Sequence, residues 1–438
     1  MTVRRASPWI SQLERRRPVV ALEGNEAADT VVVGGGIAGL ATAFFVLRDT
    51  DRDVVLLEQG LVAHGATGHN AGQAVAALEG WFDEMAAELG EAEVMQGYRE
   101  VLSGWDRLQD ILTRLERPGD LLRVEGKVAL STPEAVRSLM NERAKWIAAG
   151  APHMAMAVVK GALSDLPEGV KEVSEGEMMR VLRTIDRRYI AAVCMASGVL
   201  NAAVLTEALA EHLLVAYPKR FRLFERSAVR RARLGDEVAV TTDRGTVHGD
   251  NMVLCTNGYT DIEMQACEAP VYQGNVKGVV GFMAGRFGDG PDGAEAFFRG
   301  AEHGYYYLTR RQYAGRPFIC IGGPEEELGA DERYDAAKDY DPQAYEHIDA
   351  FARETLGDRD GWDMEWHGLM GYTPGGARLV GADPGSPSLL YNLGCNGIGL
   401  LASLAGGWKV AQLMRGTLFP HSMFDPSRLA RDRIMRIV

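Results

Sequence analysis

Hydrophobic and polar positions along the chain first predict a strand, a tight turn, a helix and a second strand between residues 29 and 58. Two short apolar runs, at 31–33 and 54–57, have the length and composition of buried strands. The segment between them opens with three glycines and continues with apolar residues at helical spacing: Ile37, Leu40, Phe44 and Leu47. This order predicts one βαβ unit.

Between residues 79 and 190 the spacing of the apolar residues changes twice, from helical to strand-like and back to helical. Apolar residues between 79 and 115 recur at helical spacing, and we expect their aromatic and methionine side chains to fill a core. A short strand at 124–130, a charged helix around 133–149 and a loop-rich stretch to 190 follow. We interpret this part as an inserted domain.

The second half of the chain also alternates between predicted helices and predicted strands. Within 197–215 the pattern predicts a short segment, SGVLNA, that leads into an amphipathic helix. It further predicts a strand meander at 228–254 with a turn at 243–245, strands at 271–283 and 304–321, and a Gly-rich segment at 368–407 leading into a last helix. Such alternation predicts an α/β chain of two interleaved domains rather than two successive ones.

Composition narrows the possible functions. A chain of 438 residues, 46% hydrophobic and 24% charged, is long enough for two or three domains. Its net charge of -13 argues against nucleic acid and slightly favours a cationic or neutral ligand. No uninterrupted apolar run reaches the roughly 18 residues of a membrane span, so we expect no stable membrane insertion. No apolar signal core follows the basic N-terminus, and we expect a cytoplasmic protein.

Cysteines and histidines give no support to disulfides or metal chemistry. The nine histidines include no HExxH pattern. The five cysteines are far apart and form no CxxC pair: Cys194, Cys255, Cys267, Cys320 and Cys395. We therefore expect neither a structural disulfide nor a metal site.

Residues 34–39, with the sequence GGGIAG, fit the pattern GxGxxG directly after a strand and at the start of a helix. Gly34 permits the tight turn, Gly36 lets backbone approach a pyrophosphate, and Gly39 lets the helix pack closely on the strand. The N–H groups at the helix start would face the phosphates. The predicted dinucleotide-binding residues here are Gly34, Gly36, Ile37, Ala38 and Gly39.

Glu58 ends the second strand about 20 residues further on, where an acidic residue accepts hydrogen bonds from ribose hydroxyls and repels a 2′-phosphate. This favours FAD or NAD over NADP. The following segment, 65–73 (GATGHNAGQ), is a second loop of small residues. An NAD domain would continue with strands and helices, whereas FAD needs a second stretch of backbone against its flavin end. FAD is therefore the predicted cofactor.

These segments resemble the D-amino acid oxidase-like superfamily of FAD-dependent oxidoreductases, which includes glycine oxidase, sarcosine oxidases and γ-glutamylputrescine oxidase. The resemblance also covers segments 197–214, 254–259, 305–323 and 366–399. It implies a Rossmann-like FAD-binding domain interleaved with a mixed-sheet substrate-binding domain. The implied FAD-binding parts are 27–115, 197–260 and 366–438, and the implied substrate-domain parts are 116–196 and 261–365.

Segment 392–399 resembles the family's flavin-contacting turn, so the start of the next helix would point at the flavin. A helix N-terminus carries about half a positive charge, which would stabilise negative charge on the flavin. A helix start that needs glycine only for packing is the alternative. The other implied FAD contacts are Gln59, Thr67, Gly68, His69, Asn70, Ala71, Gly72, Gln73, Val229, Thr256, Asn257, Gly258, Gly397, Ile398, Gly399 and Leu400.

Two positions depart from the family pattern. Relatives that act on α-amino acids often carry arginine in a Gly-Leu-Arg-Pro turn to clamp the carboxylate, whereas this chain has Met370 there. We therefore expect amines, or acids whose anion lies away from the reacting carbon, to be preferred over simple α-amino acids. Arg378 replaces a proline of the family and is either a substitute anion anchor or a surface residue.

The mode of flavin attachment is a separate question. The cysteine that some sarcosine oxidases bond to flavin aligns near Gly368, so that linkage is absent. His69 aligns with a histidine that is bonded to flavin in dimethylglycine dehydrogenase, while other relatives carry arginine there and leave the flavin unattached. Because Gly68 and Asn70 depart from the covalent pattern, we expect His69 to pack on the flavin without a bond.

Candidate catalytic residues lie on two predicted strands. Tyr305 and Tyr307 share one strand face and could line an amine pocket, or simply pack within a sheet. Lys277 is a candidate for orienting the water that reacts with oxygen, although an exposed strand lysine is the alternative.

The resulting hypothesis is an enzyme that oxidises a primary or secondary amine or amino acid to the imine. The hydride would pass to flavin N5, with O2 as electron acceptor. The alternatives are a dehydrogenase that passes electrons to a quinone or an electron-transfer flavoprotein, and a flavoprotein that oxidises hydroxy acids.

Overall fold

The computed structural model describes residues 3–152, 154–265, 269–288, 294–300, 304–329 and 332–430. No helix in these ranges combines the length and the apolarity needed to cross a bilayer. Four cysteines are free thiols, at positions 194, 255, 320 and 395, and Cys267 lies outside the described residues. Within the same ranges, no three His, Cys, Asp or Glu residues are grouped so that they could hold a metal ion.

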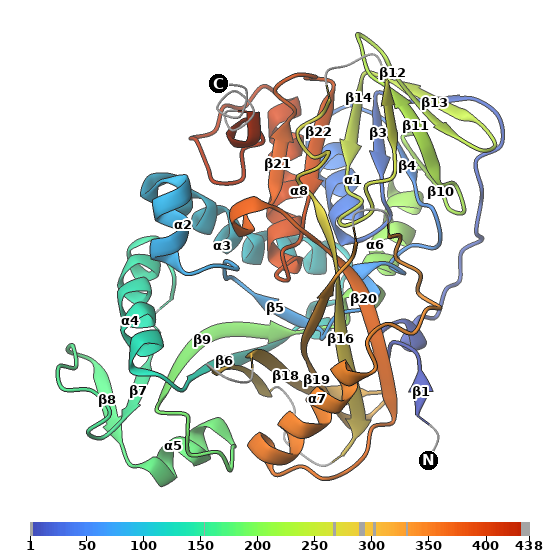
Figure 1. Cartoon of the computed structure of the whole chain (residues 1–438). Coiled ribbons are helices and arrows are strands. Elements are labelled where there is room, and N and C mark those ends of the chain that lie inside the picture. Colours follow the sequence, from blue (N-terminus) through green and yellow to red (C-terminus); the bar gives the residue numbers. More distant parts are fainter. Residues whose placement is uncertain are drawn as a thin grey trace.

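A six-stranded sheet forms the first structural layer (Figure 1). Its first five strands are parallel and the last is antiparallel. In spatial order they are β10 (Phe221–Phe224), β4 (Val54–Leu57), β3 (Thr30–Val33), β14 (Asn251–Leu254), β22 (Leu389–Leu393) and β21 (Leu379–Ala382). The central strands are apolar throughout because both faces of this sheet are covered.

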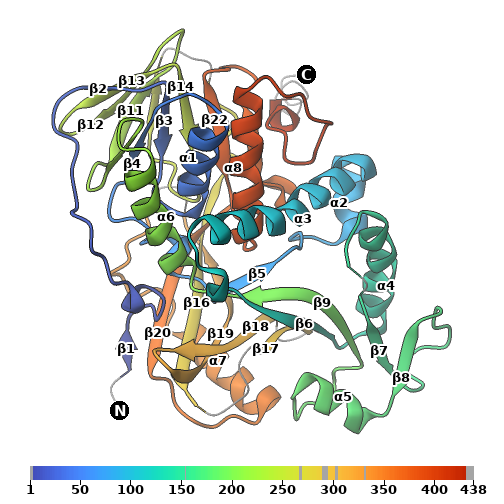
Figure 2. The ribbon, with the colours of Figure 1, turned by 180° about the vertical axis from the view of Figure 1, so that it is seen from behind.

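Helices cover one face of this sheet, and Figure 2 shows them in front of it. Val32 and Leu56 belong to the core formed with these helices, whereas Val31 and Val33 face a small sheet on the other side. The helices are α1 (Ile37–Asp49), α3 (Glu91–Arg114), α6 (Ala202–Ala216) and α8 (Leu400–Met414). The small sheet consists of β15 (Glu263–Gln265), β11 (Val229–Arg233), β12 (Val238–Thr242), β13 (Thr246–Gly249) and β2 (Glu26–Ala27).

A large mixed sheet forms the second layer, with eleven strands among the described residues. The main path runs β1 (Arg4–Arg5), β20 (Met364–Tyr372), β16 (Lys277–Phe287), β19 (Arg316–Glu327), β18 (Gly304–Tyr313), β17 (Ala294–Gly300), β6 (Leu122–Leu130), β9 (Ala191–Val199), β7 (Met156–Val159) and β8 (Val170–Val173), and β5 (Gln73–Val75) pairs with β9.

The far face of the large sheet packs on α5 (Glu175–Leu182) and α7 (Gln343–Phe351). Two further helices, α2 (Phe82–Leu89) and α4 (Pro133–Ala148), flank α3. The fold is therefore mixed α/β, with a Rossmann-like sheet and a mixed sheet that alternate along the chain.

Three sequence expectations differ from the structure. The helical region 79–115 is broken at Gly90, whose φ of +96° places it in a conformation that favours glycine. The stretch to 190 contains β7, β8 and α5 rather than mainly loop. Strand β20 belongs to the large sheet because it pairs with β16, so the implied FAD-binding part 366–438 begins within the other sheet.

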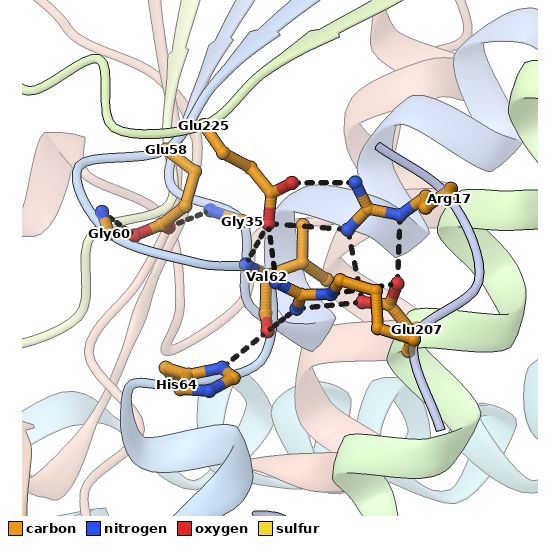
Figure 3. A network of polar contacts seen from close by, with 9 residues as sticks. Arg17, Gly35, Glu58, Gly60, Val62, His64, Glu207 and Glu225 are labelled. Atoms are coloured by element: carbon orange, nitrogen blue, oxygen red, sulfur yellow. Dashed lines mark hydrogen bonds and ion pairs between the residues drawn. The ribbon is translucent and has the colours of Figure 1, made fainter. Parts of the chain in front are cut away.

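A buried ionic network joins the N-terminal segment to the six-stranded sheet (Figure 3). Arg17 donates to Glu225 at 2.6 Å and contacts Glu207 at 2.8 Å, and Arg15 contacts the same two carboxylates. Glu225 also accepts the Val62 N–H at 2.7 Å. Burial would raise the pKa of Glu225, but Arg17 and the Val62 N–H lower it overall. The network therefore fixes the chain just after Glu58.

We predict that Arg17→Met lowers the free energy of unfolding by about 3–5 kcal/mol, because it leaves two buried carboxylates short of a partner. Urea unfolding at pH 7 measures this loss. Arg16→Met is the control, since Arg16 and its partner Glu14 are 81% and 84% exposed; this change should cost less than about 0.5 kcal/mol. Equal effects of the two substitutions would contradict the account.

Candidate functional site

A cavity of about 890 Å³ runs from the end of β3 to the large sheet. One end is lined by the glycine turn at 34–36, and the other by tyrosines of β18 and residues of β20. Its volume lies near the upper end of the range for ligand pockets, about 300–1,000 Å³. One long ligand and a smaller one can therefore share it.

The glycine turn divides into structural and ligand-facing positions. Gly34 has φ +110°, and a Cβ there would lie 2.6 Å from the Cys255 carbonyl oxygen. A Cβ on Gly39 would overlap the Gly34 carbonyl, so Gly39 serves helix packing. A Cβ on Gly36 would meet only Thr67 Oγ1, at 3.0 Å, and Gly36 lines the cavity. Gly36 is therefore the position where backbone is left open to a ligand.

Glu58 lies at the cavity wall, at the end of β4. Its two carboxyl oxygens accept N–H groups from Gly35 at 2.6 Å and Gly60 at 2.7 Å (Figure 3). Burial raises the pKa of Glu58 despite these donors, and the charge of Glu225 adds to the rise. The carboxyl group is thus held in one orientation while lone pairs stay available for ribose hydroxyls.

The loop at 65–73 is organised by its own side chains. Asn70 donates to the Thr67 carbonyl at 2.6 Å and accepts the Gly72 N–H at 2.7 Å. His69 donates from Nδ1 to the Gly65 carbonyl at 3.0 Å, and burial lowers its pKa. The imidazole is therefore neutral, with the Nε2 lone pair available. A Cβ on Gly368 would lie 2.6 Å from that of His69, so the loop packs directly on β20.

The turn before α8 is tied to both sheets by Asn257. Its side-chain oxygen accepts N–H groups from Cys395 at 2.9 Å and Gly371 at 3.2 Å. Arg378 lies nearby, 3% exposed, and donates to Asn392 at 2.5 Å. Among the described residues it has no ion-pair partner, and burial lowers its pKa to about 10. Arg378 is therefore a buried cation at the cavity, not a surface residue.

Three buried polar atoms of cavity-lining residues have no hydrogen-bond partner within the described part of the chain: Thr256 Oγ1, Gln73 Nε2 and Arg378 Nε. Buried polar groups are normally paired, so such atoms mark the place of a ligand. Together with the open Gly36 turn and the carboxylate of Glu58, they fit a dinucleotide with phosphates, ribose hydroxyls and a heteroaromatic ring. The residues present therefore fit FAD.

The other end of the cavity carries a cluster of titratable side chains. Tyr372 donates to Glu325 at 3.1 Å. A Cβ on Gly397 would lie 3.0 Å from Tyr372 Oη and 3.2 Å from Glu79 Oε2, so both groups meet the turn before α8. Glu79 is open to the cavity but enclosed by protein, and this burial, with the charge of Glu325, raises its pKa to about 8. A carboxyl group poised near neutrality suits proton transfer.

Tyr305 and Tyr307 line the same end, with ring centroids 5.8 Å apart. Tyr306 takes the opposite face and stacks on Phe351. Lys277 lies elsewhere: its side chain is 65% exposed at the start of β16 and pairs with Glu327 at 2.7 Å. Lys277 does not line the cavity, although Tyr372, its partner on β20, does, and the expected role of Lys277 at the flavin stays a prediction.

Most residues predicted for the cofactor line the cavity. They are Gly34, Gly36, Ile37, Ala38, Glu58, Gln59, Thr67, His69, Asn70, Ala71, Gln73, Val229, Thr256, Asn257, Gly397, Ile398, Gly399 and Leu400. Four glycines do not line it and instead allow close packing of backbone: Gly39, Gly68, Gly72 and Gly258. For example, a Cβ on Gly258 would lie 2.5 Å from the Met370 carbonyl oxygen.

Sequence reasoning missed several cavity residues that carry charge or a hydroxyl, among them Glu79, Arg299, Glu325 and Tyr372. The sequence could have indicated Glu79, because it is the one acidic residue in an otherwise apolar or glycine stretch at 74–82. Arg299 and Glu325 had none, since only the pairing of distant strands brings them to the cavity.

Comparisons with known proteins identify the family of this chain. A family model described as FAD dependent oxidoreductase (DAO) matches residues 29–413. γ-Glutamylputrescine oxidoreductase of Escherichia coli is 27% identical over 139 residues, which are 31% of this chain and only 32% of that protein. Glycine oxidase of Geobacillus kaustophilus has a TM-score of 0.69 at 19% identity, covering 91% of this chain and 98% of that one.

L-Proline dehydrogenase of P. horikoshii has a TM-score of 0.71 at 17% identity, covering 93% of this chain and 99% of that one. At these identities the structural likeness defines the fold. The family model spans most of the sequence, and the chain belongs to the DAO family of FAD-dependent oxidoreductases, with FAD as its cofactor.

We predict that Gly36→Val gives a folded protein without FAD, because the new side chain projects into the cavity and meets protein only at Thr67. Flavin absorbance per protein and the far-UV circular dichroism spectrum measure the two properties. Gly235→Val, in an exposed turn with open space around it, is the control and should keep both. A fully yellow Gly36→Val protein would place the cofactor elsewhere.

The flavin is predicted to be bound without a covalent bond to His69. Acid precipitation should leave the yellow colour in the supernatant, and His69→Ala should shift the flavin spectrum because the imidazole packs on the ring. Colour that stays in the pellet for the unmodified protein, and moves to the supernatant for His69→Ala, would demonstrate the bond instead.

Proposed function

We propose that this chain oxidises a primary or secondary amine, or an amino acid, to the corresponding imine, with O2 as electron acceptor. The proposal rests on the position of the Glu79 carboxyl group, which lines the cavity at the turn before α8. Burial and the charge of Glu325 raise its pKa to about 8. This carboxyl group shares the cavity with the aromatic side chains of Tyr305 and Tyr307.

Glu79 is proposed to prepare the amine for oxidation. An alkylammonium ion has a pKa near that of lysine, about 10.4, and cannot give up a hydride until it loses a proton. The Glu79 carboxylate accepts that proton, so that an N–H bond breaks and a carboxyl O–H bond forms. Tyr372 keeps the neighbouring Glu325 oriented through its hydrogen bond at 3.1 Å.

Other residues supply position and electrostatics. Bound FAD would supply the hydride acceptor. Tyr305 and Tyr307 line the pocket with aromatic rings, and a substrate bound against them would displace water, which strengthens the electrostatic effect of nearby groups. The N-terminus of α8 and the buried cation of Arg378 both place positive charge along the cavity, where it would stabilise an electron-rich cofactor.

Anaerobic mixing of the purified protein with a panel of amines, amino acids and hydroxy acids tests the reaction class. The proposal expects loss of the oxidised-flavin absorbance with amines, followed by oxygen consumption when air is admitted. Bleaching by hydroxy acids alone would overturn it. Bleaching by amines without oxygen consumption would replace O2 by a quinone or protein acceptor.

The pH dependence of kcat/KM should follow the protonation of the Glu79 carboxyl group. Below pH 8 its carboxyl group is protonated and cannot accept a proton, so kcat/KM should rise about tenfold per pH unit and level off near pH 8. In Glu79→Gln the rise should continue towards the pKa of the substrate amine. Glu84→Gln, an exposed change on α2, is the control. A rise that still ends near pH 8 in Glu79→Gln would contradict this role.

A further inference from the structure

We infer that Arg299 binds a carboxylate of the substrate, which makes the preferred substrate an amino acid whose carboxylate is remote from the oxidised amine. This inference rests on the proposed amine oxidation and specifies its substrate class. Arg299 lines the cavity from β17.

The guanidinium group of Arg299 is held in position by aromatic rings. It lies 4.7 Å from the centroid of the Trp81 ring and 5.7 Å from that of Tyr305. The backbone of Arg299 is fixed between two strands, where it pairs with Leu130 and Tyr305. A planar cation placed on rings in this way keeps its hydrogen-bond donors directed sideways, as carboxylate recognition requires.

Arg299 has no ion-pair partner among the residues that the structure describes. Some other enclosed arginines do have one: Arg17 contacts Glu225 at 2.6 Å, and Arg48 contacts Asp49 at 2.5 Å, whereas Arg378 at the cofactor end has none among the described residues. The carboxyl groups that influence Arg299 electrostatically are Glu79 and Glu142, and burial raises the pKa of both. Glu142 moreover already accepts the Phe82 N–H at 2.5 Å. A cation in a cavity without a committed partner is suited to a ligand anion.

The position of Arg299 in the sheet sets where that anion lies. Met370 occupies the place on β20 where relatives acting on α-amino acids carry the clamping arginine. Between β20 and β17 stand β16, β19 and β18. Four strand spacings amount to about 19 Å in a flat sheet, and less across a curved one. The carboxylate would therefore bind on the β17 side of the pocket and not next to Met370 on β20.

The electrostatics of the pocket support a substrate with both charges. Glu79 offers an ammonium group a proton acceptor, and Arg299 favours a carboxylate. An amine with no acid would leave the guanidinium without a counter-charge, and an acid with no amine would leave Glu79 without a proton to accept. A molecule with an amine at one end and a carboxylate at the other satisfies both sites.

The test uses the FAD-loaded protein and matched pairs of compounds. Each straight-chain ω-amino acid from glycine to 8-aminooctanoate is compared with the alkylamine of equal length, and the rate of anaerobic flavin bleaching gives kcat/KM. We expect the ratio of acid to amine to peak beyond glycine at about 10- to 100-fold, the range of a charge-assisted pair. In Arg299→Gln the ratio should fall to about one, with Arg299→Lys intermediate.

A binding measurement separates specificity from folding. Hexanoate, which has the acid but no amine, should perturb the flavin spectrum, and its Kd should weaken at least tenfold in Arg299→Gln. Arg123→Gln is the matched control, because Arg123 also lies over a tryptophan ring, Trp105, but does not line the cavity. This variant should keep both the ratio and the Kd.

The possible failures are distinguishable. If no amine bleaches the flavin, with or without a carboxylate, the proposed function is wrong. If alkylamines react as well as the ω-amino acids, or if Arg299→Gln keeps the ratio and the hexanoate Kd, amine oxidation stands and the role of Arg299 is wrong. If the ratio of acid to amine is highest for glycine, the carboxylate binds towards Met370, and the role of Arg299 is wrong.

Discussion

The ion pairs of Arg15 and Arg17 with Glu207 and Glu225 are the contacts on which the cofactor end depends. Glu225 follows β10, Glu207 lies on α6, and the two arginines come from the segment before β3. Because Glu225 also accepts the Val62 N–H, the network holds the chain that leaves β4. Glu58 sits at the start of that chain. Four segments distant in sequence thus determine the orientation of one cavity-facing carboxyl group.

Charge is distributed unequally along the cavity. The part between α1 and α8 holds the buried cation of Arg378 and the N-termini of two helices, which suits an anionic dinucleotide. The part against the large sheet holds Glu79 and Glu325 with Arg299. An anionic cofactor and an amine-bearing substrate would each meet complementary charge, and the flavin would lie where the two regions join. The net charge of -13 gave only a faint indication of this arrangement.

The local sequence pattern correctly predicted those elements whose structure depends mainly on residues close to one another in the chain. The βαβ unit at 29–58, the strands β11 to β13 of the predicted meander and the last helix all follow from periodicity and glycine placement, whereas β14 leaves the meander for the six-stranded sheet. The roles of the individual glycines were harder to predict, because a glycine can either face a ligand or allow close packing of backbone. Gly36 faces the cavity, whereas Gly68 and Gly258 permit close backbone packing, and only the neighbouring strands distinguish these cases.

The substrate end could not be predicted because it is assembled from distant strands. Arg299 reaches the cavity through the parallel pairing of β17 with β6, whereas Lys277 does not line it and its side chain is 65% exposed. Both are ordinary strand residues in the sequence. Tyr305 and Tyr307 were found because alternation alone puts them on one face, although the sequence could not say which face.

A crystal structure of the FAD-loaded protein tests most directly the claim that one cavity holds both cofactor and substrate site. We predict ribose hydroxyls within hydrogen-bond distance of Glu58. The flavin ring should lie between His69 and Gly397, and its open face should be directed towards Glu79 and Tyr305. A flavin ring bound outside this cavity, or one whose reactive face is directed away from Glu79, would contradict the account.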